Sequence, residues 1–207
     1  MQSDYLDVNN YDYTGKKKSV INKMVKIMSG QLRYDSDYVY IRHYMTVYQY
    51  VPLWVLMNVL TIGQLSKIYA SQKGRIQIKV CQDFGPLKIN ELGKMLAVMT
   101  KFRNVCAHND RLFDFRTKDA LLDRNIYERL QITKEKGRYK YGKNDLYAQV
   151  IILKLFLSEE DFRIFFHDLK RCFKKHLIHK EILEKMGFPE NWERIGKIKK
   201  YTKSEIY

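Results

Sequence analysis

Apolar residues recur along most of this chain at steps of three and four positions, the spacing that places them on one face of an α-helix. The stretch 75–84 permits either a strand or a helix, and a helix is favoured because no partner strand is evident. The stripes predict helices over these ranges: 19–32, 38–50, 52–62, 64–72, 75–84, 89–108, 145–157, 158–177 and 180–186, with a final turn around Trp192. An all-α fold without internal repeats is therefore expected.

Helix breakers and capping residues divide these stripes. Pro52 is expected in the first turn of the 52–62 helix, and Gly63 at the break after it. Ser158 followed by three acidic residues is typical of a helix start. Between residues 113 and 144 the stripe is lost and charge accumulates, which indicates a basic loop or small hairpin. The expected division is a polar tail at 1–18, a helical region at 19–112, the basic segment at 113–144, and C-terminal helices of the same domain at 145–207.

The charge balance favours a polyanionic partner. The 207 residues include 38 Lys and Arg against 23 Asp and Glu, which gives a net charge of +15. Nucleic acid or an anionic membrane surface would attract such a protein. The longest apolar run, residues 51–62, is shorter than the roughly 20 residues of a membrane-spanning helix. With no apolar signal-peptide block in the first 18 residues, the chain is expected to be cytoplasmic and without a membrane partner.

The cysteines and tryptophans predict packing roles. Cys81, Cys106 and Cys172 are widely spaced, which favours small buried hydrophobic residues over disulfides or zinc ligands. Trp54 and Trp192 are expected to anchor the core. No HExxH, HxxxH, GxxxxGK or GxGxxG pattern occurs, so neither a metal nor a cofactor is expected.

The candidate chemistry lies in RNVCAH, residues 103–108. Histidine titrates near neutral pH and suits proton transfer to and from a ribose 2′-hydroxyl and a leaving oxygen, while arginine suits a phosphate. His108 and Arg103 are the candidates for these roles, and Asn104 would orient the histidine or hold a phosphate oxygen. The alternative is a plain helix end, whose polar groups cap carbonyls and pair with Asp110 or Asp114.

Spacing alone does not decide between these two interpretations, because RCFKKH at 171–176 repeats it on a basic helix face. Residues five apart on a straight helix also point about 140° apart. Convergence of Arg103 and His108 on one phosphate therefore requires the helix to end or bend between them. Otherwise a second copy of the chain must supply the facing residue across a two-fold axis.

Other side chains are candidates for RNA contact or association. Arg111 either helps hold RNA or forms a salt bridge with Asp114. Tyr139 and Tyr141, among cations, are suited to stacking on bases. The tyrosine series 38, 40, 44 and 48 is expected in the core and on a dimer surface. The cationic candidates for RNA binding are Arg111, Lys134, Lys136, Arg138, Lys140, Lys170, Arg171, Lys174 and Lys175.

Three blocks carry a family resemblance: PLWVLMNVLTIGQLSKIY (52–69), RNVCAHNDRLF (103–113) and MGFPENWERI (186–195). In this order they resemble the Abi-like family of bacterial phage-resistance proteins, the AbiD/AbiF group of the HEPN superfamily. The resemblance implies a helical bundle, commonly dimeric, in which many members are metal-independent ribonucleases with an arginine, a polar residue and, a few positions on, a histidine. That motif carries over to Arg103, Asn104 and His108.

The resemblance implies an RNA-cleaving toxin or abortive-infection effector, with RNA as substrate or as inhibitory partner, or with an antitoxin that restrains it. Family members usually have a longer tyrosine-rich region ahead of the 52–69 block, so a fragment, a shortened member and an inactivated member all stay open. The alternative function is a non-catalytic RNA-binding or regulatory protein of a defence complex. Cleavage that survives chelators separates the two.

Overall fold

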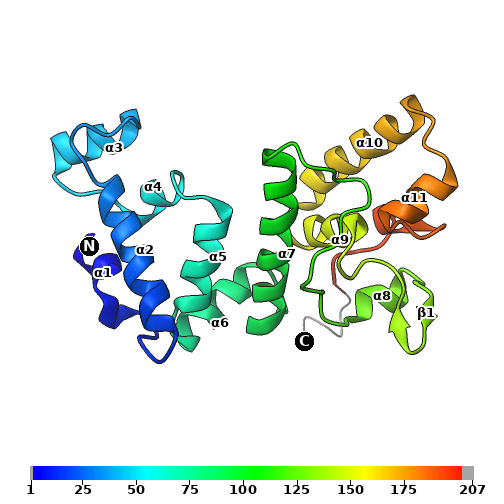
Figure 1. Cartoon of the computed structure of the whole chain (residues 1–207), viewed down its shortest axis with the longest axis horizontal. Helices are drawn as coiled ribbons and strands as arrows, with labels where there is room; N and C mark the ends of the chain where they lie inside the picture. Colours follow the sequence, from blue (N-terminus) through cyan, green and yellow to red (C-terminus); the bar gives the residue numbers. More distant parts are fainter. Residues whose placement is uncertain (1, 202–207) are drawn as a thin grey trace. The chain divides into compact units, whose positions relative to one another are not determined.

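The computed structural model describes residues 2–201 and divides the chain into two compact units, residues 1–80 and 81–207 (Figure 1). Helices dominate both units, and the only sheet among the described residues is one two-stranded hairpin. The prediction of an all-α fold is confirmed. The boundary between the units falls inside α6 and within the 19–112 region that the sequence pattern treats as continuous.

The first unit is built around α2. Its elements are α1 (Gln2–Leu6), the 3-10 turn η1 (Val8–Asn10), α2 (Lys17–Gln31), α3 (Val39–His43), the π turn η2 (Tyr44–Tyr48), α4 (Leu53–Met57), α5 (Ile62–Ser71) and the start of α6 (Gly74–Asp83). Helix α2 packs against α1 and α5 and buries Ile21, Met24 and Met28. The apolar stripe predicted for this helix therefore faces the core.

Residues 2–18 are part of this core. The Tyr5 hydroxyl donates to the Val51 carbonyl at 2.6 Å, and the Tyr11 hydroxyl donates to the Tyr5 carbonyl at 2.6 Å. Both tyrosines are buried, and burial raises the pKa of Tyr5 to about 12. The segment expected as a polar tail thus supplies two core side chains.

The break after α4 lies earlier than the sequence pattern predicts. Helix α4 ends at Met57, and α5 begins after Thr61, whose hydroxyl accepts from the Gln64 N–H at 3.3 Å. The Gln64 side chain in turn accepts from the Thr61 N–H at 2.7 Å, which completes a capping box. The prediction of a break at Gly63 is wrong, because this box already starts the helix at Ile62.

Several aromatic residues of the first unit face solvent rather than the core. Trp54 is 66% exposed, so its predicted role as a core anchor is wrong. Tyr38, Tyr40 and Tyr48 are also exposed, which excludes the core as their place. The helical period identifies which residues share a face, but it does not reveal whether another element covers that face.

The second unit is built around α9. Its elements are the end of α6, then α7 (Ile89–Ala107), α8 (Asn125–Arg129), β1 (Lys134–Glu135), β2 (Arg138–Tyr139), α9 (Leu146–Phe156), α10 (Glu159–Lys175), α11 (Lys180–Met186) and the 3-10 turn η3 (Trp192–Gly196). Helix α9 packs against α7 and α10. No residue of α9 is exposed, and its fully buried side chains cover just over half of the helix circumference: Tyr147, Ala148, Val150, Ile151, Ile152, Lys154 and Leu155.

The basic segment 113–144 folds back onto the start of α7. Arg124 forms an ion pair with Glu91 at 2.5 Å, and each side chain is only 9% exposed. Glu91 also accepts from the Lys88 N–H at 2.7 Å and so caps α7. The strands pair Lys134 with Tyr139 and Glu135 with Arg138 around a two-residue turn, Lys136-Gly137, in which both φ angles are positive. The predicted small hairpin is confirmed, whereas the sequence pattern did not predict α8.

Burial of the cysteines and of Trp192 is mixed. Cys81 and Trp192 are buried, as predicted. The prediction of burial is wrong for Cys106 and Cys172, which are exposed. Both lie in the last turn of a helix, where their side chains face solvent. Within residues 2–201 no helix combines the length and apolar character needed to cross a membrane.

The N-cap of α9 predicts an unusual pH dependence. The Asp145 carboxylate accepts from the N–H groups of Ala148 at 2.9 Å and Gly142 at 2.8 Å, in a space so close that a Cβ at Gly187 would collide with it. Burial nevertheless raises the pKa of Asp145 to about 6. Because the folded-state pKa lies above the unfolded value of about 3.9, the folded state binds more protons between about pH 4 and 6. The contribution of Asp145 to the free energy of unfolding therefore falls as the pH rises through this window.

We expect Asp145→Asn to keep the capping oxygen and to remove this decline. The free energy of unfolding of the variant, relative to wild type, should rise by roughly 2–3 kcal/mol from pH 4 to pH 7. Urea denaturation at several pH values measures the difference, in which the other titrating groups cancel. A difference that does not change with pH would contradict the raised pKa.

Candidate functional site

RNVCAH forms the last turn of α7 and its C-terminal cap. The helix continues through Ala107, and the His108 N–H still donates to the Asn104 carbonyl at 2.9 Å. Asn109 then adopts a left-handed backbone, with φ at 55°. The N–H groups of Asn109 and Asp110 donate back to the carbonyls of Cys106 at 3.3 Å and Val105 at 3.0 Å. This is a Schellman ending with asparagine at its left-handed position, so the predicted helix end at 108–110 is confirmed.

The three motif side chains are exposed and follow one another along the end of α7 as a row, in which Arg103 and Asn104 share a hydrogen bond. The Arg103 guanidinium donates to the Asn104 side-chain oxygen at 3.3 Å. Asn104 and His108 lie four residues apart and are therefore neighbours on one helix face. Arg103 and His108 form no ion pair with a carboxylate of residues 2–201; Asp114 instead pairs with Arg111 at 2.6 Å. The row therefore leaves the charge of Arg103 and the ring of His108 available to a ligand.

The course of α7 bears on whether Arg103 and His108 can meet. The helix is regular from Arg103 to Ala107 and ends there, with His108 as its cap residue. At about 100° per residue the side chains of Arg103 and His108 would leave a continuous helix roughly 140° apart, in different directions. Both routes to convergence that the sequence analysis names therefore stay open: the helix end before His108, and a facing residue from a second copy.

RCFKKH repeats the backbone geometry of RNVCAH at the end of α10. His176 is the cap residue, Leu177 has φ at 49°, and the N–H groups of Leu177 and Ile178 donate back to the carbonyls of Lys174 and Phe173. The side chains differ, because Arg171 pairs with Asp168 at 3.1 Å. Cysteine also replaces the amide that follows the arginine in RNVCAH. The two helix ends have the same backbone conformation, but only the end of α7 carries the row of arginine, amide and histidine.

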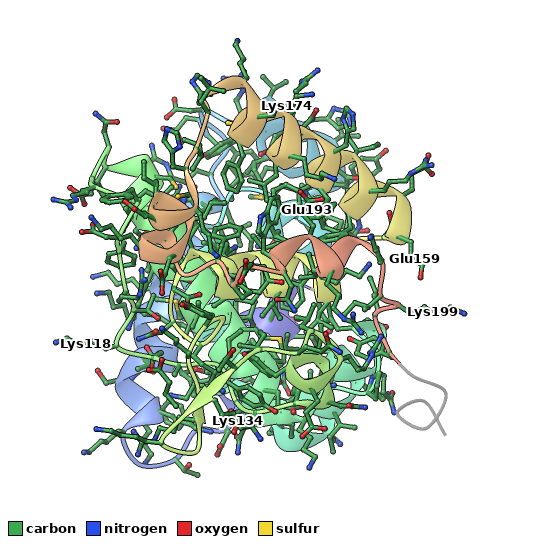
Figure 2. All side chains as sticks on the ribbon, turned by 90° about the vertical axis from the view of Figure 1, so that its right-hand side faces the viewer. Lys118, Lys134, Glu159, Lys174, Glu193 and Lys199 are labelled. Carbon is green, nitrogen blue, oxygen red and sulfur yellow. The ribbon has the colours of Figure 1, made fainter. Side chains whose placement is uncertain are left out.

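Three of the predicted RNA-binding cations meet at one groove of the second unit. Lys170, Arg171 and Lys174 line a groove of about 780 Å³. Figure 2 shows Lys174 toward the end of α10 and Glu193 on the neighbouring turn η3. Lys170 is paired with Glu193 at 2.6 Å. Lys175 is exposed but is not among the residues that line the groove. The apolar part of the lining consists of Phe173, Leu177, Ile178, Leu183 and Trp192.

The hairpin cations differ in their availability. Lys134 lies 4.5 Å from the centre of the Tyr139 ring, and Lys140 pairs with Glu135 at 3.0 Å and with Glu184 at 3.4 Å. The hydrogen bonds of the Lys140 ammonium with Glu135, Tyr141 and Glu184 hold the pKa of Lys140 above its ordinary value. Lys136 and Arg138 are exposed and form no ion pair with any residue of 2–201. They are the cations of this hairpin that are open to phosphate.

The predicted stacking tyrosines are not open to bases. Tyr139 is 7% exposed, and its ring stacks on Tyr127 at 4.7 Å. Tyr141 is half-buried and donates its hydroxyl proton to Glu184 at 2.7 Å.

In the described part of the chain, no three His, Cys, Asp or Glu side chains lie close enough together to form a metal site.

A sequence model of the Abi-like protein family matches residues 1–114. The chain belongs to the Abi-like family. The match covers the whole first unit, α7 with Arg103, Asn104 and His108, and the following Arg111. Membership of this family implies a role in phage resistance by abortive infection. No curated protein and no solved structure matches the chain.

Exchanging leucine and asparagine at the left-handed positions of the two helix ends should change the free energy of unfolding in opposite directions. Leu177 holds a left-handed conformation that disfavours residues with a branched or bulky side chain, while Asn109 fills the same position of α7 at little cost. Because Leu177 is 76% exposed, it gains little from burial in return. We expect Leu177→Asn to raise the free energy of unfolding by about 1 kcal/mol and Asn109→Leu to lower it by a similar amount. Urea denaturation measures both changes. If both substitutions shift the free energy of unfolding in the same direction, the left-handed backbone does not determine their effects.

Proposed function

We propose that this member of the Abi-like family is a metal-independent endoribonuclease of HEPN type that acts in abortive infection. The observation that carries the proposal is the exposed row of Arg103, Asn104 and His108 at the end of α7. Family membership supports it, because the matched region contains this row. The excess of cations supports RNA as the substrate.

The proposed reaction needs only these side chains and the RNA itself. A neutral His108 accepts the proton of the ribose 2′-hydroxyl, whose oxygen then attacks the adjacent phosphorus. As the bond between phosphorus and the 5′-oxygen breaks, a protonated His108 donates to that oxygen. The products are a 2′,3′-cyclic phosphate and a 5′-hydroxyl, so atoms and protons balance without a co-reactant. Arg103 stabilises the charge that develops on the phosphate, and Asn104 orients the histidine.

The proposed active form is a symmetric homodimer. Arg103 and His108 diverge on one helix, whereas two copies of α7 that meet across a two-fold axis would place the arginine of one beside the histidine of the other. Partner RNA or an antitoxin that covers this composite site would restrain cleavage.

The open cations favour a second candidate, a non-catalytic RNA-binding or regulatory role. Lys136, Arg138, Lys174 and Lys175 are exposed and carry no ion pair with a described residue. They can contact phosphates whether or not His108 reacts. This candidate predicts RNA binding without cleavage.

We expect His108→Ala to abolish RNA cleavage and to leave RNA binding within about twofold, because the histidine moves protons and adds little to phosphate affinity. Purified protein is incubated with tRNA in excess EDTA, and growth and total RNA are followed after induced expression. His176→Ala is the matched control, since it removes the histidine from the same kind of helix end. The proposal fails if the wild type binds RNA but does not cut it, or if both variants cut equally.

Mixing two inactive variants tests the composite site. We expect Arg103→Ala and His108→Ala to be inactive alone and to recover activity when mixed and allowed to exchange subunits. A mixed dimer then contains one site with both the arginine and the histidine. If each site instead lies within one chain, the mixture stays inactive while the wild type cuts, and the dimer arrangement is wrong.

A further inference from the structure

Lys154 is a mostly buried cation whose ammonium keeps a small contact with solvent and has no polar partner among residues 2–201. It lies in α9 and is only 5% exposed, and its ammonium sits 4.6 Å from the centre of the Phe162 ring. It forms no hydrogen bond and no ion pair with any residue of 2–201. An ammonium has three donors, and burying it without acceptors is strongly unfavourable. The favourable contact with Phe162 offsets only part of this cost.

The Lys154 side chain lines a pocket of about 540 Å³. The pocket lies between the start of α10 and the segment that follows η3. Its other cations are Arg163, Lys197 and Lys199, and its aromatic walls are Phe162 and Phe166. Glu159 and Lys199, which both line it, lie at the same edge of the view in Figure 2. Lys154 is buried, whereas the other three cations that line the pocket are exposed.

Positive charge predominates around this pocket. The four cations outnumber the two carboxylates that line it, Glu159 and Glu160. Glu160 lies 3.8 Å from Arg163, at the outer limit of an ion pair, while Lys197 and Lys199 form no ion pair with a described residue. Burial lowers the pKa of Lys154, and repulsion from Lys200 and Arg129 lowers it further, against the attraction of Glu159. The protein thus holds several like charges together with too few anions to balance them.

We propose that this pocket binds a phosphate monoester group, with Lys154 at its base and Lys197 and Lys199 at its rim. A phosphate offers several acceptor oxygens and a double negative charge, which match the donors and the excess charge of the pocket. The half-buried Phe166 ring gives an apolar wall for a base or sugar attached to that phosphate. The group can come from a free nucleotide or from the 5′ end of an RNA strand. This site lies outside RNVCAH, and the inference does not depend on ribonuclease activity.

Calorimetric titration of the full chain in chloride buffer tests the proposal. The probes are inorganic phosphate, adenosine monophosphate, and one RNA tetranucleotide with either a 5′-phosphate or a 5′-hydroxyl. We expect saturable binding of the phosphate-bearing probes, weakened about tenfold or more by Lys154→Met and by the double substitution Lys197→Gln with Lys199→Gln. Lys118→Gln, at an exposed lysine outside the pocket, should leave binding unchanged. Preference for the 5′-phosphorylated RNA over the monophosphate identifies RNA ends as the source, and the reverse preference identifies a free nucleotide.

Thermal melting of Lys154→Met separates binding from a structural role. Methionine keeps the apolar stem and removes the unpartnered charge, so we expect the ligand-free variant to melt at a higher temperature than wild type and to lose the stabilisation by phosphate. A lower melting temperature without ligand, or unchanged phosphate affinity in Lys154→Met, would overturn the proposal. So would the absence of saturable binding to the wild type. If Lys154→Met does not fold, the double variant at the exposed rim decides the matter.

Discussion

The need to bury α9 on almost every side organises the second unit. An amphipathic helix requires one covering surface, but this helix carries apolar side chains all round and must be enclosed. Helix α7 covers one face and α10 another. Two interactions hold the segment between α7 and α9 in place: the Asp145 cap at the start of α9, and the buried ion pair between Arg124 of this segment and Glu91 of α7. The motif helix, the basic hairpin and the cationic groove are therefore all placed by the covering of one helix.

A charged side chain on a helix enclosed in this way is costly to bury and therefore needs an explanation. Lys154 is the ionisable side chain among the buried residues of α9, and a leucine or methionine there would satisfy the same packing at lower cost. Covering the helix explains every buried side chain on it except this one. The pocket around the ammonium contains more cations than carboxylates, so Glu159 and the Phe162 ring offset its charge only in part. An unbalanced charge in an otherwise consistent core is what physical reasoning associates with a binding site.

Much of the fold follows from the sequence where local signals agree. The stripe over 89–108, the serine and acids at 158–161, and Gly187 after the 180–186 helix each match the observed elements within one or two residues. Three of the failures have a common cause. Trp54, Cys106 and Cys172 lie on apolar stripes that no neighbouring element covers, and coverage depends on residues distant in sequence. Gly63 has a different reason: the capping box of Thr61 and Gln64 encloses it in the first turn of α5, so the glycine does not break the helix.

Some of the candidate functional residues can likewise be identified from the sequence, whereas others cannot. RNVCAH is visible in the sequence because its residue types carry the chemistry, and His108-Asn109-Asp110 also signals the helix end. Its repetition as RCFKKH shows that backbone geometry alone does not distinguish the two, since both helices end in the same hydrogen-bond pattern. Lys154 has no comparable signal, because a lysine inside LYAQVIILKLF is indistinguishable from a solvent-facing one until α10 is seen to cover it.

The family match ends at residue 114, which separates two physical tasks along the chain. Arg103, Asn104 and His108 lie inside the matched region, whereas the open cations of the hairpin and of α10 lie beyond it. Charge on these outer elements affects how long and in what orientation a polyanion stays, because phosphate contacts position a strand without reading it. The proton transfers depend on groups within hydrogen-bond reach of the reacting atoms. In the ribonuclease that we propose, changes in residues 115–207 can therefore alter which RNA is held, with no alteration of the row at the end of α7.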